Sequence, residues 1–161
     1  MSFILQKFSE MLNDMLVAVY HKILRVEEDF LQTGIGAGLT IREMHMIEFV
    51  GKAGNNGRTL SETAEFLEIP RPSATVSVKK LEKKGLLVKK GCPQDGRVVH
   101  VTLTRDGRRV FMHHLRFHMV MVQELESALS KEEKAVLTRA IRKLDSFFEK
   151  SIEASRSVEA S

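Results

Sequence analysis

The chain is 161 residues long, which is enough for one domain, or for one domain with an added oligomerisation element. Hydrophobic residues make up 43% of the sequence and charged residues 29%, which is typical of a folded soluble protein and excludes a disordered one. The formal net charge is +4, and between Asn55 and Val110 lysines and arginines are twice as numerous as aspartates and glutamates, so the middle of the chain suits a negatively charged partner.

The N-terminal segment has the apolar period of one long amphipathic helix, from about residue 3 to about residue 32. Its apolar residues recur at spacings of three or four and are Phe8, Leu12, Met15, Val19, Ile23, Val26 and Phe30. At about 1.5 Å per residue such a helix is roughly 45 Å long, which is more than a small domain can cover. No apolar run approaches the roughly 20 residues that span a bilayer, and the segment lacks the pattern of a secretory signal. We therefore expect a cytoplasmic protein.

Two capping boxes predict the next two helices, with a glycine-rich turn between them. The boxes are Thr40 with Glu43, for a helix to about Lys52, and Thr59 with Glu62, for a short helix to about Glu68. In each box a hydroxyl and a carboxylate satisfy amide groups of the first turn. Both helices precede the most distinctive part of the chain.

The stretch from Pro70 to Thr104 has the element order of a winged helix. A basic amphipathic helix is predicted over about 72–84 and ends near Gly85. Strand-like runs follow over about 86–90 and 98–104, joined by a polar tip. Helix, strand, basic loop and strand in this order predict a DNA-binding element.

Two more helices are predicted to complete the chain, over about 105–129 and 130–154, with a frayed tail after them. Long helices with one apolar face at both ends of the chain need a partner, and a symmetric dimer is the common solution. The predicted fold class is mainly α with a small β-wing (α+β). Its predicted parts are a winged helix-turn-helix domain over 39–105 and a helical dimerisation region formed by 1–38 and 106–161.

The helical wheel of the basic helix separates a packing face from a DNA-reading face. Ala74, Val78 and Leu81 fall on one side and are expected to pack inward. Hydroxyl and valine side chains in the first turns can read base edges, whereas lysines suit phosphates. In the wing, Asp95 can pair with Arg97 and hold it toward a minor groove. The predicted DNA-contacting residues are Arg71, Ser73, Thr75, Val76, Lys79, Lys80, Lys83, Lys89, Asp95 and Arg97. The alternative is a solvated basic face.

Three motifs in this region resemble the multiple-antibiotic-resistance regulator (MarR) family of winged-helix repressors. They are LEKKGLL at 81–87, DGR at 95–97 and LTRDG at 103–107. The resemblance extends to both flanking helices and implies a homodimer that represses transcription from a pseudo-palindromic operator. It places Asp95 and Arg97 in the wing pair of the family. Many members carry arginine where Val76 stands, so a base preference does not carry over from them.

The signal that such a regulator senses is less defined, and one hypothesis is a metal ion. His114 and His118 are four residues apart, so both imidazoles lie on one face of a helix, as metal ligands often do. The chain is also similar to the zinc-responsive branch of the family. This similarity implies a zinc site formed by Glu27, His45, His114 and His118.

The second hypothesis is a small apolar or aromatic acid held between helices in a crevice lined by Met15, Phe49 and Phe111. Cys92, the single cysteine, excludes an internal disulfide and is interpreted as an ordinary exposed thiol rather than a redox sensor. An enzyme is not expected, because the motifs of zinc peptidases, serine hydrolases and P-loop proteins do not occur. A winged-helix protein-interaction module that does not contact DNA stays as an alternative.

Overall fold

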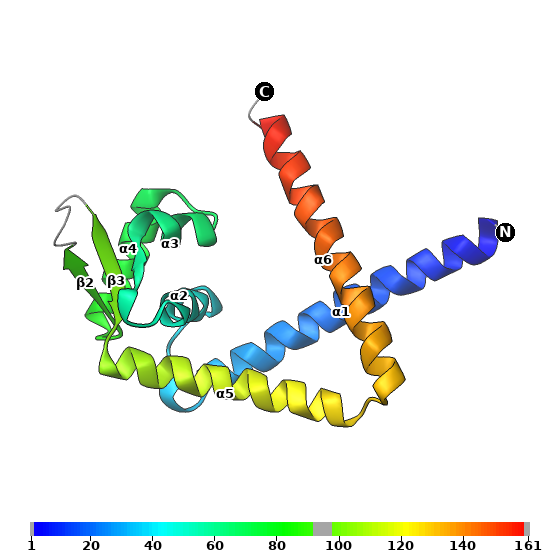
Figure 1. The fold of residues 1–161 in the computed structure, drawn as a ribbon, viewed down its shortest axis with the longest axis horizontal. Helices are drawn as coiled ribbons and strands as arrows, with labels where there is room; N and C mark the ends of the chain where they lie inside the picture. The colour runs from blue at the N-terminus through cyan, green and yellow to red at the C-terminus, as the bar shows by residue number, and fades with distance from the viewer. Residues whose placement is uncertain (1, 92–97, 160–161) are drawn as a thin grey trace. The chain divides into compact units, whose positions relative to one another are not determined.

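The computed structural model describes the backbone of residues 2–91 and 98–159 and the side chains of residues 7–91 and 98–155. The chain forms two compact units, residues 1–115 and 116–161, and the boundary between them falls within α5. The elements shown in Figure 1 are α1 (Ser2–Gln32), η1 (Gly34–Gly36), α2 (Ile41–Lys52), η2 (Gly54–Asn56), β1 (Arg58–Thr59), α3 (Leu60–Phe66), α4 (Arg71–Lys83), β2 (Leu87–Gly91), β3 (Val99–Leu103), α5 (Arg105–Ser127) and α6 (Lys131–Glu159).

Both predicted capping boxes are present at the starts of α2 and α3. The Thr40 hydroxyl accepts a hydrogen bond from the Glu43 amide at 3.2 Å, and the Glu43 carboxylate accepts one from the Thr40 amide at 3.0 Å. Thr59 and Glu62 make the same reciprocal pair at 3.1 and 2.7 Å. Each box satisfies two backbone donors that the first turn of a helix leaves open. The sequence therefore placed both helix starts correctly.

Helix α4 ends at Lys83, near Gly85 as predicted. Gly85 has a φ of +72°, in the left-handed region that favours glycine. Its amide donates to the Glu82 carbonyl at 2.9 Å, and the Leu86 amide donates to the Leu81 carbonyl at 2.9 Å. These two bonds satisfy carbonyls that the last turn leaves open, so the chain leaves α4 in a fixed direction and enters β2.

The last two helices differ from their predicted ends. Helix α5 ends at Ser127, two residues early, and Ser130 with Glu133 caps α6 through bonds of 3.2 and 2.8 Å. Helix α6 continues to Glu159, so the prediction of a frayed tail after Ala154 is wrong. The tail contains no glycine or proline, so the sequence offers no residue that stops a helix there.

The sheet has three antiparallel strands in the order β1-β3-β2, where the sequence predicted two strands. Strand β1 pairs Arg58 with Val101 and Thr59 with His100. Two residues are too few to show an alternating pattern, which is why β1 was missed. Gly57, just before β1, has a φ of +68°, and a Cβ there would lie 2.2 Å from the Val101 carbonyl oxygen. Only glycine fits this approach of β1 to β3.

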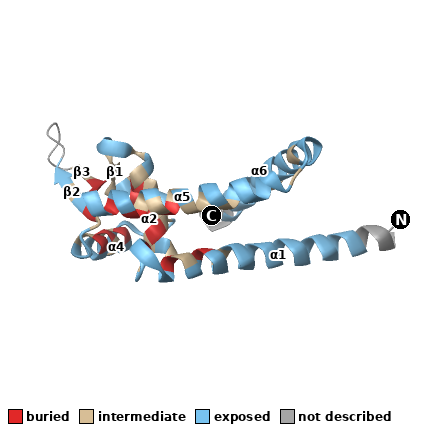
Figure 2. Cartoon of the chain, turned by 90° about the horizontal axis from the view of Figure 1, so that it is seen from below, coloured by how far each residue is buried: buried red, intermediate tan, exposed pale blue. Residues whose placement is uncertain are grey.

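The core lies where α2, α4 and the sheet meet, which is where the buried residues gather in Figure 2. Its buried members are Leu31, Met44, Met46, Ile47, Val50, Val78, Leu81, Leu87, Val101, Leu103 and Val110. Burial of each large apolar side chain contributes about 1.5–3 kcal/mol. One face of α4 therefore packs on the core, and its opposite face is exposed.

Helices α1 and α6 keep apolar side chains exposed within their own units. On α1 the exposed residues include Phe8 and Met15, with 55% and 58% of their surface accessible, and Figure 2 colours most of α1 as exposed. On α6 they include Phe147 and Phe148, with 62% and 52%. Among the described residues, none of the helices has the length and apolar character required to cross a membrane.

Candidate nucleic-acid interface and a buried carboxylate–histidine cluster

Helix α4 has the two faces that the helical wheel predicted. Ala74, Val78 and Leu81 are fully buried. Val76 is 54% exposed, and the Thr75 hydroxyl, on a partly buried residue, donates to the Arg71 carbonyl at 3.0 Å. The other predicted DNA-contacting residues of α4 are all exposed and are Arg71, Ser73, Lys79, Lys80 and Lys83. A helix with this arrangement presents hydroxyls and an apolar methyl near its N-terminus and cations toward its C-terminus.

An ion pair joins the end of α4 to the first turn of α2. The Lys84 ammonium donates to the Gly38 carbonyl at 2.9 Å and lies 2.8 Å from the Glu43 carboxylate. Burial acts to raise the pKa of Glu43, but the hydrogen bonds from Lys84 and from the Thr40 amide outweigh it, so that pKa lies below its usual value. Glu43 is therefore ionised at neutral pH and holds Lys84 in place.

The wing is joined to α4 by a second ion pair. The Lys89 ammonium on β2 lies 2.6 Å from the Glu82 carboxylate on α4. The Lys89 ammonium was predicted to contact DNA and here is paired with Glu82. A contact between Lys89 and DNA therefore stays a prediction. Lys90 is exposed beside it. Asp95, Arg97 and Cys92 lie outside the described residues.

A carboxylate and two imidazoles meet in the first unit, from α1, α2 and α5. The Glu27 Oε1 atom lies 3.0 Å from His114 Nε2 and 3.3 Å from His45 Nε2. Glu27 and His114 are buried, with 4% and 1% of their surface exposed. The His45 side chain is 44% exposed, so the cluster has a route to solvent at this residue. Three of the four predicted metal ligands are therefore together.

The fourth predicted ligand and one further carboxylate extend this set. His118 lies one helical turn beyond His114 on α5, in the second unit. Glu48 was not predicted, although its position three residues after His45 on the same helix is a signal that could have found it. Its Oε2 atom lies 3.8 Å from His114 Nδ1, and its Oε1 atom lies 2.6 Å from the Lys52 ammonium.

The residues predicted to line a crevice for a small acid lie among different neighbours. The Phe49 ring stacks on Phe66 with a centroid distance of 4.1 Å. Phe111 covers Gly51, where an added Cβ would lie 2.7 Å from the ring. Met15 is exposed on α1. The small-acid hypothesis stays a prediction.

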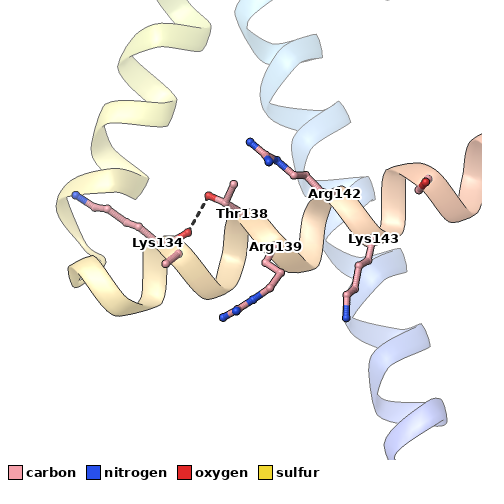
Figure 3. Close-up of a pocket in the computed structure, with 7 residues that line it drawn as sticks. Lys134, Thr138, Arg139, Arg142 and Lys143 are labelled. Atoms are coloured by element: carbon pink, nitrogen blue, oxygen red, sulfur yellow. Dashed lines mark hydrogen bonds between the residues drawn. The ribbon is translucent and has the colours of Figure 1, made fainter.

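The second unit carries a shallow hollow on α6 that includes none of the predicted site residues (Figure 3). The Thr138 hydroxyl donates to the Lys134 carbonyl at 2.8 Å, and the Lys134 ammonium lies 3.3 Å from the Glu126 carboxylate. Its lining residues are Lys134, Ala135, Thr138, Arg139, Arg142, Lys143 and Ser146. By helical periodicity these residues lie opposite the apolar residues of α6. The hollow is the polar face of an amphipathic helix.

Comparison with known sequences finds relatives among transcriptional regulators. Residues 37–98 match the model of a family described as the MarR family. The HTH-type transcriptional regulator MhqR of Bacillus subtilis (strain 168) is 28% identical over 107 residues, which cover 66% of this chain and 72% of MhqR.

Solved structures agree in fold. FabT of Streptococcus pneumoniae, determined in complex with DNA, is similar with a TM-score of 0.83 and 33% identity, over 88% of this chain and 97% of FabT. The S. aureus MepR–DNA complex is similar with a TM-score of 0.68 and 22% identity, over 83% of this chain and 96% of MepR. The second likeness concerns the fold alone.

Proposed function

The chain belongs to the MarR family of transcriptional regulators, and on this premise we propose that it represses transcription as a homodimer bound to a pseudo-palindromic operator. The observation that carries the proposal is the outward face of α4, whose polar and cationic side chains are exposed while its opposite face forms part of the core. FabT and MepR, which share the fold, are both described as bound to DNA. A regulator of this kind acts where the chromosome lies, so the proposal includes a cytoplasmic location.

In this proposal α4 enters the major groove. A helix of 13 residues is about 20 Å long, and the groove is wide enough to admit it. Ser73 and Val76 then face base edges, while Lys79 and Lys83 contact phosphates and add affinity without sequence information. The wing residue Arg97 is assigned to the adjacent minor groove, as the sequence predicted.

The apolar side chains that α1 and α6 expose support the homodimer. Such long apolar faces are costly in water and are usually covered by a partner, most often a second copy related by a twofold axis. A symmetric dimer presents two copies of α4, which bind half-sites about 34 Å apart, or one turn of DNA. The operator is therefore expected to be pseudo-palindromic.

Binding to the DNA upstream of the gene that encodes the chain tests this function. The double variant Lys79→Ala/Lys83→Ala should weaken binding to every sequence by a similar factor. It should also lower the slope of log affinity against log salt by about two units for each half-site. Fluorescence anisotropy over a salt series measures both quantities, with Lys22→Ala on α1 as a control. An affinity that does not depend on salt would contradict the phosphate contacts, and a lack of DNA binding would support a protein-interaction module.

For the effector, we propose a Zn²⁺ ion held by Glu27, His45, His114 and His118. The closeness of a buried carboxylate to two imidazole nitrogens supports this set, because two or three histidines with one carboxylate suit Zn²⁺ better than Mg²⁺ or Ca²⁺. A bound ion would draw side chains from α1, α2 and α5 into one set of ligands. It would thereby link a dimerisation helix to the domain that carries α4.

Zinc affinity tests the metal site. His45→Ala and His118→Ala should each lower zinc affinity by at least about tenfold, because each removes a donor and leaves the buried pair in place. Equilibrium dialysis with a competing chelator measures the affinity, and His21→Ala, an exposed histidine of α1, is the matched control. Bound zinc that is unaffected by either ligand variant would exclude the site.

A further inference from the structure

A small cleft lies between the start of α2 and one flank of α4. It is lined by Thr40, Arg42, Glu43 and Met46 from the α2 side and by Ser77 and Lys80 from α4. Lys80 was predicted to contact DNA, whereas Arg42 and Ser77 were not. The cleft therefore combines two cations and two hydroxyls from separate elements.

The net charge of the cleft is positive, because the negative charge of its one acidic lining residue, Glu43, is balanced by a lysine. The Glu43 carboxylate is held by the Lys84 ammonium at 2.8 Å and by the Thr40 amide at 3.0 Å. The bonds to Glu43 thus remove the main source of repulsion for an anion. Arg42 is exposed, and its guanidinium group presents several donors in a planar fork.

The cleft is large enough for one chemical group, such as a phosphate, but too small for a whole small-molecule ligand. Its volume is about 170 Å³, whereas sites for small molecules begin at roughly 300 Å³. The cleft is suited to one tetrahedral anionic group that stays attached to something larger. A phosphodiester has this character, and guanidinium groups bind it through paired hydrogen bonds.

The position of the cleft decides which phosphodiester it meets. Ser77 and Lys80 are one turn apart on the flank of α4 that faces α2, whereas Val76 and Lys83 lie on the side opposite the core. When the side opposite the core lies in the major groove, a phosphate backbone runs along each flank of the helix. The backbone on the α2 flank passes over the cleft.

We infer that this cleft binds one backbone phosphate of the operator in each half-site, with Arg42 and Lys80 as the cations and the Ser77 hydroxyl as a neutral donor. The inference rests on the proposed DNA-binding function and adds a contact from outside the recognition helix. Such a contact fixes the position of α4 along the groove because it is made by α2, which belongs to the core. It carries no base information of its own.

Replacing Arg42 with alanine tests the contact. The variant should bind specific and unrelated DNA more weakly by a similar factor, and its salt slope should fall by about one unit for each half-site. Raising the salt from roughly 50 to 200 mM weakens DNA binding. For each phosphate contact that the variant has lost, this weakening should be about 3.5-fold smaller than in the unmodified chain. Arg42→Lys should keep the slope, and Lys52→Ala, at the other end of α2, should leave both affinity and slope unchanged.

Single methylphosphonate substitutions in the operator, which remove the charge of one phosphate, identify the partner. At one phosphate in each half-site, the substitution should weaken binding of the unmodified chain by a larger factor than binding of Arg42→Ala, because that variant keeps only Lys80 and Ser77 at this phosphate. A salt slope that Arg42→Ala leaves unchanged, or methylphosphonate effects that are the same in both proteins, would overturn this inference alone. A failure of the unmodified chain to bind DNA would overturn the proposed function together with it.

Discussion

Replacing Gly107 with alanine is expected to destabilise the chain by about 3 kcal/mol, because an added methyl group has no space there. A Cβ at this position would lie 2.0 Å from the carbonyl oxygen of Leu86, which is a backbone atom and does not move alone. The same carbonyl accepts a hydrogen bond from the Thr104 amide at 3.0 Å. In the variant, the new methyl group would therefore push the first turn of α5 away from Leu86, which lies between α4 and β2.

Thermal unfolding followed by circular dichroism measures the effect, which should be a fall of roughly 6–12 °C in Tm for a chain of this size. Gly91→Ala is the matched control. An added Cβ at Gly91 meets no atom within 4 Å, and its φ is not in the left-handed region. The two variants should thus differ clearly, and equal Tm values would show that α5 shifts without cost.

Local signals predicted most of the elements that hold this site in place. The capping boxes of Thr40 and Thr59 and the stop at Gly85 involve residues that are neighbours in sequence, so their chemistry is legible without the fold. The two faces of α4 also follow from periodicity alone. Strand β1 was not predictable in this way, because its only evidence is its pairing with β3, about 40 residues away.

The functional residues also divide into those that local sequence patterns predicted and those that depend on contacts between separate elements. The outward residues of α4 were correctly placed by the helical wheel, and Glu27, His45 and His114 lie close together, while the zinc site that the family resemblance implied stays a prediction. Pairs between distant elements were missed. Lys84 with Glu43 is such a pair, and it joins residues 41 positions apart. Lys89 was expected to be free for DNA, and only the fold brings it to Glu82.

The second large effect is expected at the buried cluster, where His114→Ala should cost about 3–5 kcal/mol in metal-free conditions. The Glu27 carboxylate would stay buried and lose its closest partner, since the His114 Nε2 atom at 3.0 Å is nearer than that of His45 at 3.3 Å. His45→Ala should cost less than about 1 kcal/mol, because an imidazole with a 44% exposed side chain exchanges its contact for water. Chemical denaturation with a chelator present measures both.

A double-mutant cycle separates the energy of the Glu27–His114 interaction from the packing cost of each substitution. Glu27→Leu and His114→Leu each remove one side of the 3.0 Å contact between Glu27 Oε1 and His114 Nε2 and keep the other polar group buried, whereas the double variant removes both groups. It should therefore be more stable than the sum of the single effects predicts. Additive effects would mean that the two side chains do not interact. Zinc binding at the proposed site would add a separate increment, because a ligand that binds only the folded chain stabilises it in proportion to the logarithm of its concentration above Kd. The proposed site therefore predicts that added zinc raises the free energy of unfolding of the unmodified chain and does so less in His45→Ala.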